Sequence, residues 1–344
     1  MNRHSSRKKN CYVDNMKLFL LAVIIFVLCS STLAMDFKPP TAEERLKAIG
    51  KTEGLHEILR KTLEPADDFE PIPTLHPGDW LAVHYEPGQT FDEFIKSKPN
   101  RPDKTRKKIY LQPIGEFPKG QIPLTDVLEE YAGAYFAMPV EVLPALSLSD
   151  KNITTRINNY TKNRQILTTD VLTILKDNLP ADAFCLLAIT MEDLYPESSW
   201  NFVFGQASLR ERVGVYSFAR YDPAFYGDKR GKDYEKLILR RSCKVLVHET
   251  GHMFGLQHCI FFRCVMNGSN HLKESDSRPL YLCPVCLRKL HHSVGFDVIS
   301  RYKNLCRFYK KFGFDDDARW LARRLEHILG PDAIRTILEQ KSEQ

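Results

Sequence analysis

The chain has 344 residues, of which 43% are hydrophobic and 27% are charged, a composition typical of a globular protein with a sizeable core. The same composition excludes collagen-like and disordered chains. Of the formal net charge of +6, residues 1–35 carry +4 and all the others together only +2. A nearly neutral body gives no reason to expect a nucleic acid as a partner.

Residues 1–34 have the pattern of a secretory signal peptide. A basic start precedes an uninterrupted apolar run, Leu18–Leu28, and small residues follow, with Thr32 and Ala34 at the spacing that signal peptidase prefers. We therefore expect secretion, or membrane anchoring through residues 18–33 if this segment is not cleaved. The alternative is a cytoplasmic or nuclear protein in which the leader has no function.

The next expected unit, residues 35–106, is an N-terminal segment that is partly helical and partly irregular. Leu and Ile recur at helical spacing from residue 41 to 61, interrupted by Gly50 and Gly54, and residues 64–106 are rich in Pro and charge. We expect this segment to precede the main domain.

Strand-like and helix-like stretches alternate over residues 107–310, which predicts an α/β (α+β) domain with a twisted mixed sheet. The predicted strands are Lys108–Gln112, Val140–Leu143, Ala183–Met191, Phe202–Phe204 and Gly214–Ala219. The predicted helices are Thr125–Phe136, residues 168–178, Leu237–Phe254, Asp297–Tyr309 and Asp316–Glu339. The last of these belongs to a C-terminal helical unit, residues 311–344, and the Cys- and His-rich stretch that ends at His292 should form a small irregular lower subdomain.

The sequence HETGHMFGLQH predicts a metal site at the end of the helix Leu237–Phe254. On a helix, His248 and His252 project from the same face, so both can bind one zinc ion. Gly255 can take the left-handed conformation that ends a helix, after which His258 becomes available as a third ligand. Three ligands leave one tetrahedral position open for water, as in a catalytic zinc site. The alternative is three histidines on an ordinary, partly buried helix.

Four cysteines close to this motif predict a second zinc site. Cys283 and Cys286 form a CxxC pair, and Cys259 and Cys264 form a wider one. Four thiolates suit a closed, structural zinc site, which would brace the loop that presents the neighbouring His258. Two disulfide bonds are the alternative, which an exported protein would permit. Three further cysteines are expected to be buried and inert: Cys185, Cys243 and Cys306.

The combined pattern resembles that of the archaemetzincins, a family of metzincin metallopeptidases, and in particular their animal branch. The pattern consists of HExxHxxGxxH, the adjacent Cys259, CVM at 264–266 and CPVC at 283–286. Upstream segments such as DAFCLLAITMEDLYP and VGVYSFARY extend the resemblance to about residues 65–310. The hydrophobic leader departs from the usual intracellular pattern of this family.

The resemblance implies a metzincin-like fold with an active-site helix and a role for each residue of the motif. The implied catalytic zinc ligands are His248, His252 and His258, the acid/base is Glu249, the Met-turn is Met266, and the ligands of a structural zinc are Cys259, Cys264, Cys283 and Cys286. From its position alone, Met266 could equally be an ordinary core residue.

We therefore expect a zinc metallopeptidase with two zinc ions per chain. A zinc-activated water would attack the peptide bond, with Glu249 as general acid/base. The substrate is a peptide or protein, held by backbone pairing to an edge strand that we place at Gly214–Ala219. The alternative is a zinc-binding scaffold that has lost its catalytic activity, and a zinc-dependent nucleic-acid module is disfavoured by the near-neutral body.

Overall fold

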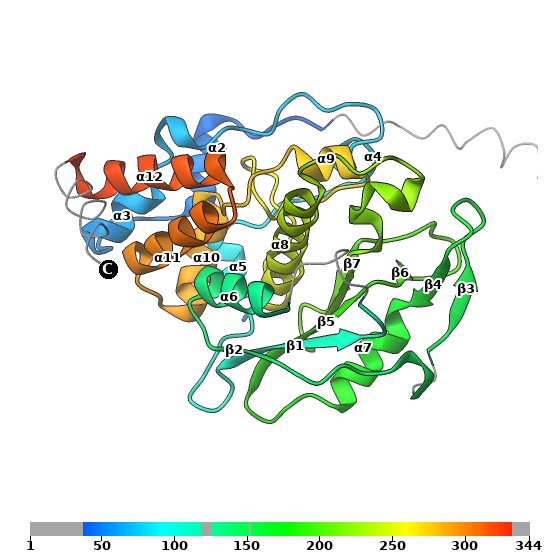
Figure 1. Cartoon of the computed structure of the whole chain (residues 1–344). Coiled ribbons are helices and arrows are strands. Elements are labelled where there is room, and N and C mark those ends of the chain that lie inside the picture. Colours follow the sequence, from blue (N-terminus) through cyan, green and yellow to red (C-terminus); the bar gives the residue numbers. More distant parts are fainter. Residues whose placement is uncertain (1–36, 118–124, 151–152, 332–344) are drawn as a thin grey trace, which may run out of the picture.

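The computed structural model describes residues 37–117, 125–150 and 153–331 (Figure 1). The predicted leader, residues 1–34, and the end of the predicted C-terminal helix, beyond residue 331, lie outside these ranges. Within the described ranges, no helix combines the length and the apolar character that a membrane span requires.

The fold is mixed α/β, as predicted, and is built on a five-stranded sheet with the strand order β2-β1-β5-β8-β7. These strands are β2 (Val140–Val142), β1 (Lys108–Ile114), β5 (Ala183–Thr190), β8 (Val213–Ser217) and β7 (Gly205–Ala207). The first four are parallel to one another, whereas β7 pairs antiparallel with β8 and forms an edge. Every residue of β5 is buried, which explains its continuous apolar sequence.

Helices cover both faces of this sheet. Side chains alternate along β5, so Leu187 packs into one core with helices α6 (Thr125–Phe136) and α8 (Tyr234–Met253). Leu186 points to the other face and joins a second core with α7 (Thr168–Asp177). Helix α8, which carries the first half of the predicted metal motif, therefore lies directly on the sheet.

A second sheet, with the order β3-β4-β6, extends one side of the molecule. Its strands are β3 (Thr155–Ile157), β4 (Arg164–Leu167) and β6 (Asp193–Tyr195), none of which the sequence analysis identified. A buried ion pair joins this sheet to the end of β8, because two guanidinium nitrogens of Arg220 lie 2.7 Å from the carboxylate oxygens of Asp193. The pair thus connects the two sheets at the turn that follows β8.

The N- and C-terminal helices form a layer on the other side of the molecule, where Figure 1 shows the blue and red ends of the chain side by side. Its helices from the N-terminal end are α2 (Ala42–Ile49), α3 (Glu57–Leu63) and α5 (Phe91–Lys96), and those from the C-terminal end are α10 (Pro284–Val294), α11 (Val298–Lys311) and α12 (Asp315–Leu329). Two short helices, α4 (Trp80–Val83) and α9 (Leu272–Asp276), lie apart from this layer and next to each other, on the other side of α8 (Figure 1). The fully buried Arg324 of α12 donates hydrogen bonds to the carbonyl oxygens of Thr62 and Glu64, which joins the two ends.

Three predictions about these elements are wrong in part. The stretch up to His292 is not irregular throughout, because Pro284 starts the helix α10. The strand expected at Phe202–Phe204 lies later, at β7. The strand expected at Gly214–Ala219 is β8, which lies between β5 and β7 and so cannot be the edge strand.

Candidate active site

The first two histidines of the motif lie one turn apart near the end of α8, and their Nε2 atoms are 3.1 Å apart. The helix ends at Met253, and Gly255 has a φ of +84°. A Cβ on Gly255 would also lie 3.0 Å from that of Pro99, so glycine is needed here for two reasons. The turn returns the chain to the other two rings, and the donor atoms of His248, His252 and His258 all lie within 4.8 Å of one another.

Each of these three rings is oriented by a hydrogen bond from Nδ1. His248 donates to the carbonyl oxygen of Val265 at 2.9 Å, and His252 donates to that of Leu256 at 2.7 Å. His258 donates instead to a carboxylate, Oε1 of Glu86, at 2.7 Å. Because these oxygens can only accept, the proton of each ring is on Nδ1 and the Nε2 lone pair is free.

The donor set fits a zinc ion. Three Nε2 lone pairs that face one another repel unless a cation lies among them, and imidazole nitrogen is a preferred ligand of zinc. Burial lowers the pKa of His252 to about 3, and the neighbouring His258 acts in the same direction. Burial also lowers the pKa of His248 well below its ordinary value, so both helix histidines are kept neutral, which is the form that binds a metal.

The side chain of Glu249 extends from α8 toward the edge strand β7. Its side chain is buried, and burial raises the pKa of its carboxyl group to about 8. A Cβ on Gly205 of β7 would lie only 2.7 Å from Oε1 of Glu249, so this strand can approach the carboxylate because it has a glycine there.

A cavity of about 660 Å³ opens beside these groups. His248, Glu249 and His258 line it together with Gly205 and Gln206 of β7. The edge strand beside the site is therefore β7 and not the expected Gly214–Ala219. The other walls of the cavity come from Trp80, Thr169, Trp200, Lys244, Ser269 and Arg278, among others.

Met266 lies directly beneath the helix that carries the first two histidines. The side chain is fully buried, and a Cβ on Gly251 would be 2.6 Å from its sulfur atom. Its carbonyl oxygen accepts a hydrogen bond from the backbone N–H of Cys259 at 2.8 Å. Met266 thus connects α8 to the loop that presents the third histidine.

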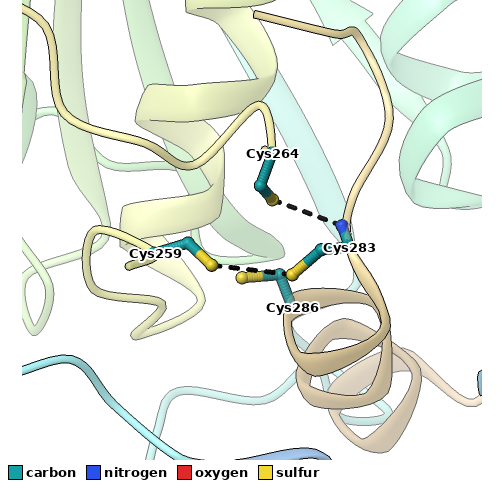
Figure 2. A group of neighbouring side chains, drawn as sticks. All are labelled: Cys259, Cys264, Cys283 and Cys286. Carbon is teal, nitrogen blue, oxygen red and sulfur yellow. Dashed lines mark hydrogen bonds between the residues drawn. The ribbon is translucent and has the colours of Figure 1, made fainter. Parts of the chain in front are cut away.

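The four predicted cysteines form a second cluster, shown in Figure 2. Cys259 and Cys264 come from the loop after α8, Cys283 is the N-cap of α10 and Cys286 lies in its first turn. Their sulfur atoms lie within 4.8 Å of one another and all four residues are buried. The Sγ atoms of Cys259 and Cys283 are 3.6 Å apart, much farther than the roughly 2.05 Å of a disulfide bond.

The chemistry of this cluster fits a closed zinc site. Hydrogen bonds from the other three thiols lower the pKa of Cys259 well below its ordinary value, so the cluster favours a thiolate. All the described cysteines are free thiols, including the buried Cys185, Cys243 and Cys306. The alternative of two disulfide bonds is therefore not what the structure adopts.

Two residues of the site were not predicted from the sequence, Glu86 and Trp80, and both come from the segment expected to be irregular. Oε1 of Glu86 accepts hydrogen bonds from Nδ1 of His258 at 2.7 Å and from Nε1 of Trp80 at 2.8 Å. The indole ring lies edge-on to the His258 ring, with centroids 5.1 Å apart, and lines the cavity. Glu86 is 172 positions from His258 along the chain, so no local spacing signals this contact.

Comparison with known proteins places this geometry in a family. Residues 141–292 match the sequence profile of Peptidase family M54. The chain is 44% identical to the archaemetzincin-2 of Macaca fascicularis and 43% identical to that of Homo sapiens, each over 74% of this chain and 79% of the relative. The archaemetzincin from Methanopyrus kandleri, whose crystal structure is known, is 29% identical in sequence to this chain. The structural match spans 56% of this chain and 97% of that protein, with a TM-score of 0.42.

The predicted resemblance is confirmed by the extent of this identity, which covers three-quarters of the chain and most of each archaemetzincin-2. The chain belongs to the archaemetzincins, Peptidase family M54, and is a zinc metallopeptidase.

Proposed function

We propose that this peptidase binds its catalytic zinc ion through Nε2 of His248, His252 and His258. The observation that carries the proposal is the convergence of three imidazoles whose Nδ1 atoms are already engaged. A fourth position facing the cavity would be left for water and substrate. The proposed substrates are peptides or proteins, in keeping with the peptidase family to which the chain belongs.

Glu249 is the general acid/base in this proposal. Zinc at such a site supplies Lewis-acid polarisation of the scissile carbonyl and makes water more acidic. The positive charge of a bound zinc ion would favour the ionised form of Glu249, against the effect of burial. The Glu249 carboxylate, next in sequence to His248 and lining the same cavity, would then accept the proton of the attacking water. It then donates this proton to the amine that leaves.

Strand β7 is the proposed support for the substrate backbone. It is the edge of the main sheet, and its residues Gly205 and Gln206 line the cavity beside Glu249. An extended peptide that paired with this edge would hold its scissile bond along the row of catalytic groups. Glycine at 205 lets this strand lie close to the Glu249 carboxylate.

The four cysteines hold a second, structural zinc ion in this proposal. Their burial leaves no side open to a substrate, and four thiolates complete a tetrahedral zinc shell. Cys259 follows His258 directly, so the structural ion would fix the loop that presents the third catalytic ligand. Met266, packed on Gly251, serves as the Met-turn beneath the catalytic site.

The test is peptide hydrolysis by the full chain before and after metal removal. A mixture of unblocked peptides should be cleaved, cleavage should stop on treatment with a zinc chelator, and added zinc should restore it. His252→Ala should abolish cleavage, whereas His327→Ala, in the distant helix α12, should not. Cleavage that persists in the zinc-free chain, or in His252→Ala, would contradict the proposal.

A further inference from the structure

Glu86 connects the N-terminal segment to the third histidine of the proposed catalytic site. We propose that Glu86 is a positioning residue that acts through His258, so that residues 76–89, here called the strap, are part of the zinc centre. The proposal rests on the proposed function, because it takes His258 to be a zinc ligand. It adds a residue to this site that lies outside the HExxHxxGxxH motif.

The three histidines differ in what holds them. His248 and His252 donate to the backbone carbonyl oxygens of Val265 and Leu256, which are neutral acceptors 17 and 4 positions away in the chain. His258 alone donates to a carboxylate, at 2.7 Å. It also lies in a loop beyond the end of α8, so the helix does not fix its ring.

The carboxylate has two effects on His258. It fixes the ring orientation and holds the proton on Nδ1, so that Nε2 points its lone pair at the other two rings. Its negative charge also makes the imidazole a stronger donor to a cation. Both effects increase the affinity of the three-histidine site for zinc.

The strap is attached to the body of the protein independently of Glu86. The backbone N–H of Trp80 donates to Oε1 of Glu274 at 2.9 Å, and Nε2 of His271 donates to Oδ1 of Asp79 at 3.2 Å. At the other end, the side-chain amide of Gln89 donates to the carbonyl oxygen of Gly255 at 3.2 Å. These contacts fix Glu86 from both sides, so its carboxylate is already in place for His258.

Glu86 is also sufficiently buried for its charge to act on His258 with little screening by solvent. Its side chain is 19% exposed and that of His258 is 20% exposed, so solvent screens their interaction less than at the surface. The second donor, Nε1 of Trp80, holds the same oxygen at 2.8 Å and restricts the carboxylate to one orientation. A merely structural role for Glu86 would be to hold Trp80 in the strap.

Zinc affinity distinguishes the two roles. The full chain is first loaded with zinc. Competition with chelators of increasing zinc affinity then measures how tightly the three-histidine site, expected to be the weaker one, holds its ion. Metal analysis follows the total zinc per chain. Glu86→Ala should weaken this site by about 10- to 100-fold. Glu86→Gln should weaken zinc binding less than Glu86→Ala, because the glutamine Oε1 can still accept a hydrogen bond from Nδ1 of His258 and only the negative charge is removed.

Two controls separate positioning from packing. Trp80→Phe removes the indole donor but keeps a ring and the Glu86–His258 contact, so zinc affinity should change by less than threefold. Glu57→Gln, on the exposed face of α3, should change nothing. If saturating zinc restores turnover in Glu86→Gln to near the wild-type kcat, the carboxylate acts through metal binding as proposed.

The proposal is overturned if Glu86→Ala and Glu86→Gln bind zinc as tightly as the wild type, or if Trp80→Phe weakens binding as much as Glu86→Ala. Should Glu86→Ala fail to fold, the comparison of Glu86→Gln with Trp80→Phe decides in the same way. Failure of the underlying function is a separate result: His252→Ala would then keep the same zinc content and activity as the wild type.

Discussion

The His cluster (His248, His252, His258) and the Cys cluster (Cys259, Cys264, Cys283, Cys286) are neighbours in the chain but have opposite environments. The His cluster has three donors, and two of its residues, His248 and His258, line a cavity of about 660 Å³. The Cys cluster has four donors and is buried between the loop after α8 and the start of α10. His258 and Cys259 are consecutive, so one loop contributes a residue to each cluster.

This difference suits the two clusters to different roles. A fourth protein donor and burial close a metal site, so its binding free energy goes into holding segments together. A missing fourth donor beside a cavity leaves a coordination position for chemistry. Because the clusters share one loop, the proposed structural ion also determines where His258 is presented.

The largest expected effect is on folding, from the Cys cluster. Cys283→Ser should remove the structural zinc, and because binding at such a site contributes on the order of 10 kcal/mol to folding, the region around α10 should lose its stable structure. Thermal unfolding and metal analysis measure this. The control is Cys306→Ser, another buried thiol that lies outside the cluster and should keep both ions. Equal stability of the Cys283 and Cys306 variants would contradict a structural ion.

The next effect should be on turnover with folding unchanged. Glu249→Gln keeps the shape of the side chain but cannot accept a proton, so kcat should fall by about 10²- to 10⁴-fold. The zinc content should remain that of the wild type. Glu235→Gln, in the first turn of the same helix, is the matched control and should be fully active. A Glu249→Gln enzyme with normal kcat would show that another group transfers the proton.

A smaller effect is expected where Met266 supports the His cluster. Gly251→Ala would place a Cβ at 2.6 Å from the Met266 sulfur, so the methionine must shift and the free energy of unfolding should fall by about 1–3 kcal/mol. Gly133→Ala, in helix α6, is the control, because the nearest atom to a Cβ at this position would be 3.7 Å away. That variant should be neutral or more stable by about 0.5–1 kcal/mol. Chemical denaturation that gave the same loss for both would remove the argument for close packing.

The smallest expected effect is at the turn that leads to His258. Gly255→Ala must adopt a φ of +84° and should cost about 1 kcal/mol of stability or somewhat more. Gly295→Ala, with a φ of +75° at the end of α10 and open space around it, should cost somewhat less, because only the backbone strain applies there and no Pro99 lies close. Only the Gly255 variant should also weaken zinc binding, because only that turn positions a ligand. Equal zinc affinity in the two variants would show that the turn does not limit the site.

Much of the candidate site follows from local spacing in the sequence. The four-residue separation of His248 and His252 requires only a helix, and a helix was predictable there. Gly255 indicated its end. The four cysteines were recognisable because CxxC and its partner pair lie within one short region. Strand β5 was predictable from its apolar run, since a strand buried on both faces needs no polar residue.

The other features depend on contacts between distant parts of the chain. Nothing local marks Glu86 as the partner of His258, because the contact exists only when the strap is folded over the site. Strand β7 has only three residues, and its glycine and glutamine are typical of a loop, so its pairing with β8 is needed to identify it as a strand. Helix α10 was missed because its Cys and His content suggested metal ligands rather than a helix, although Pro284 at its first turn is a typical start.

The zinc content of the purified full chain, measured for the wild type and for His248→Ala, tests whether the two clusters are separate metal sites. We expect two zinc ions per wild-type chain and one per variant chain, with the remaining ion held by the cysteines. Two ions in the variant, or a single ion in both proteins, would contradict the assignment of the histidines to one metal site and the cysteines to another.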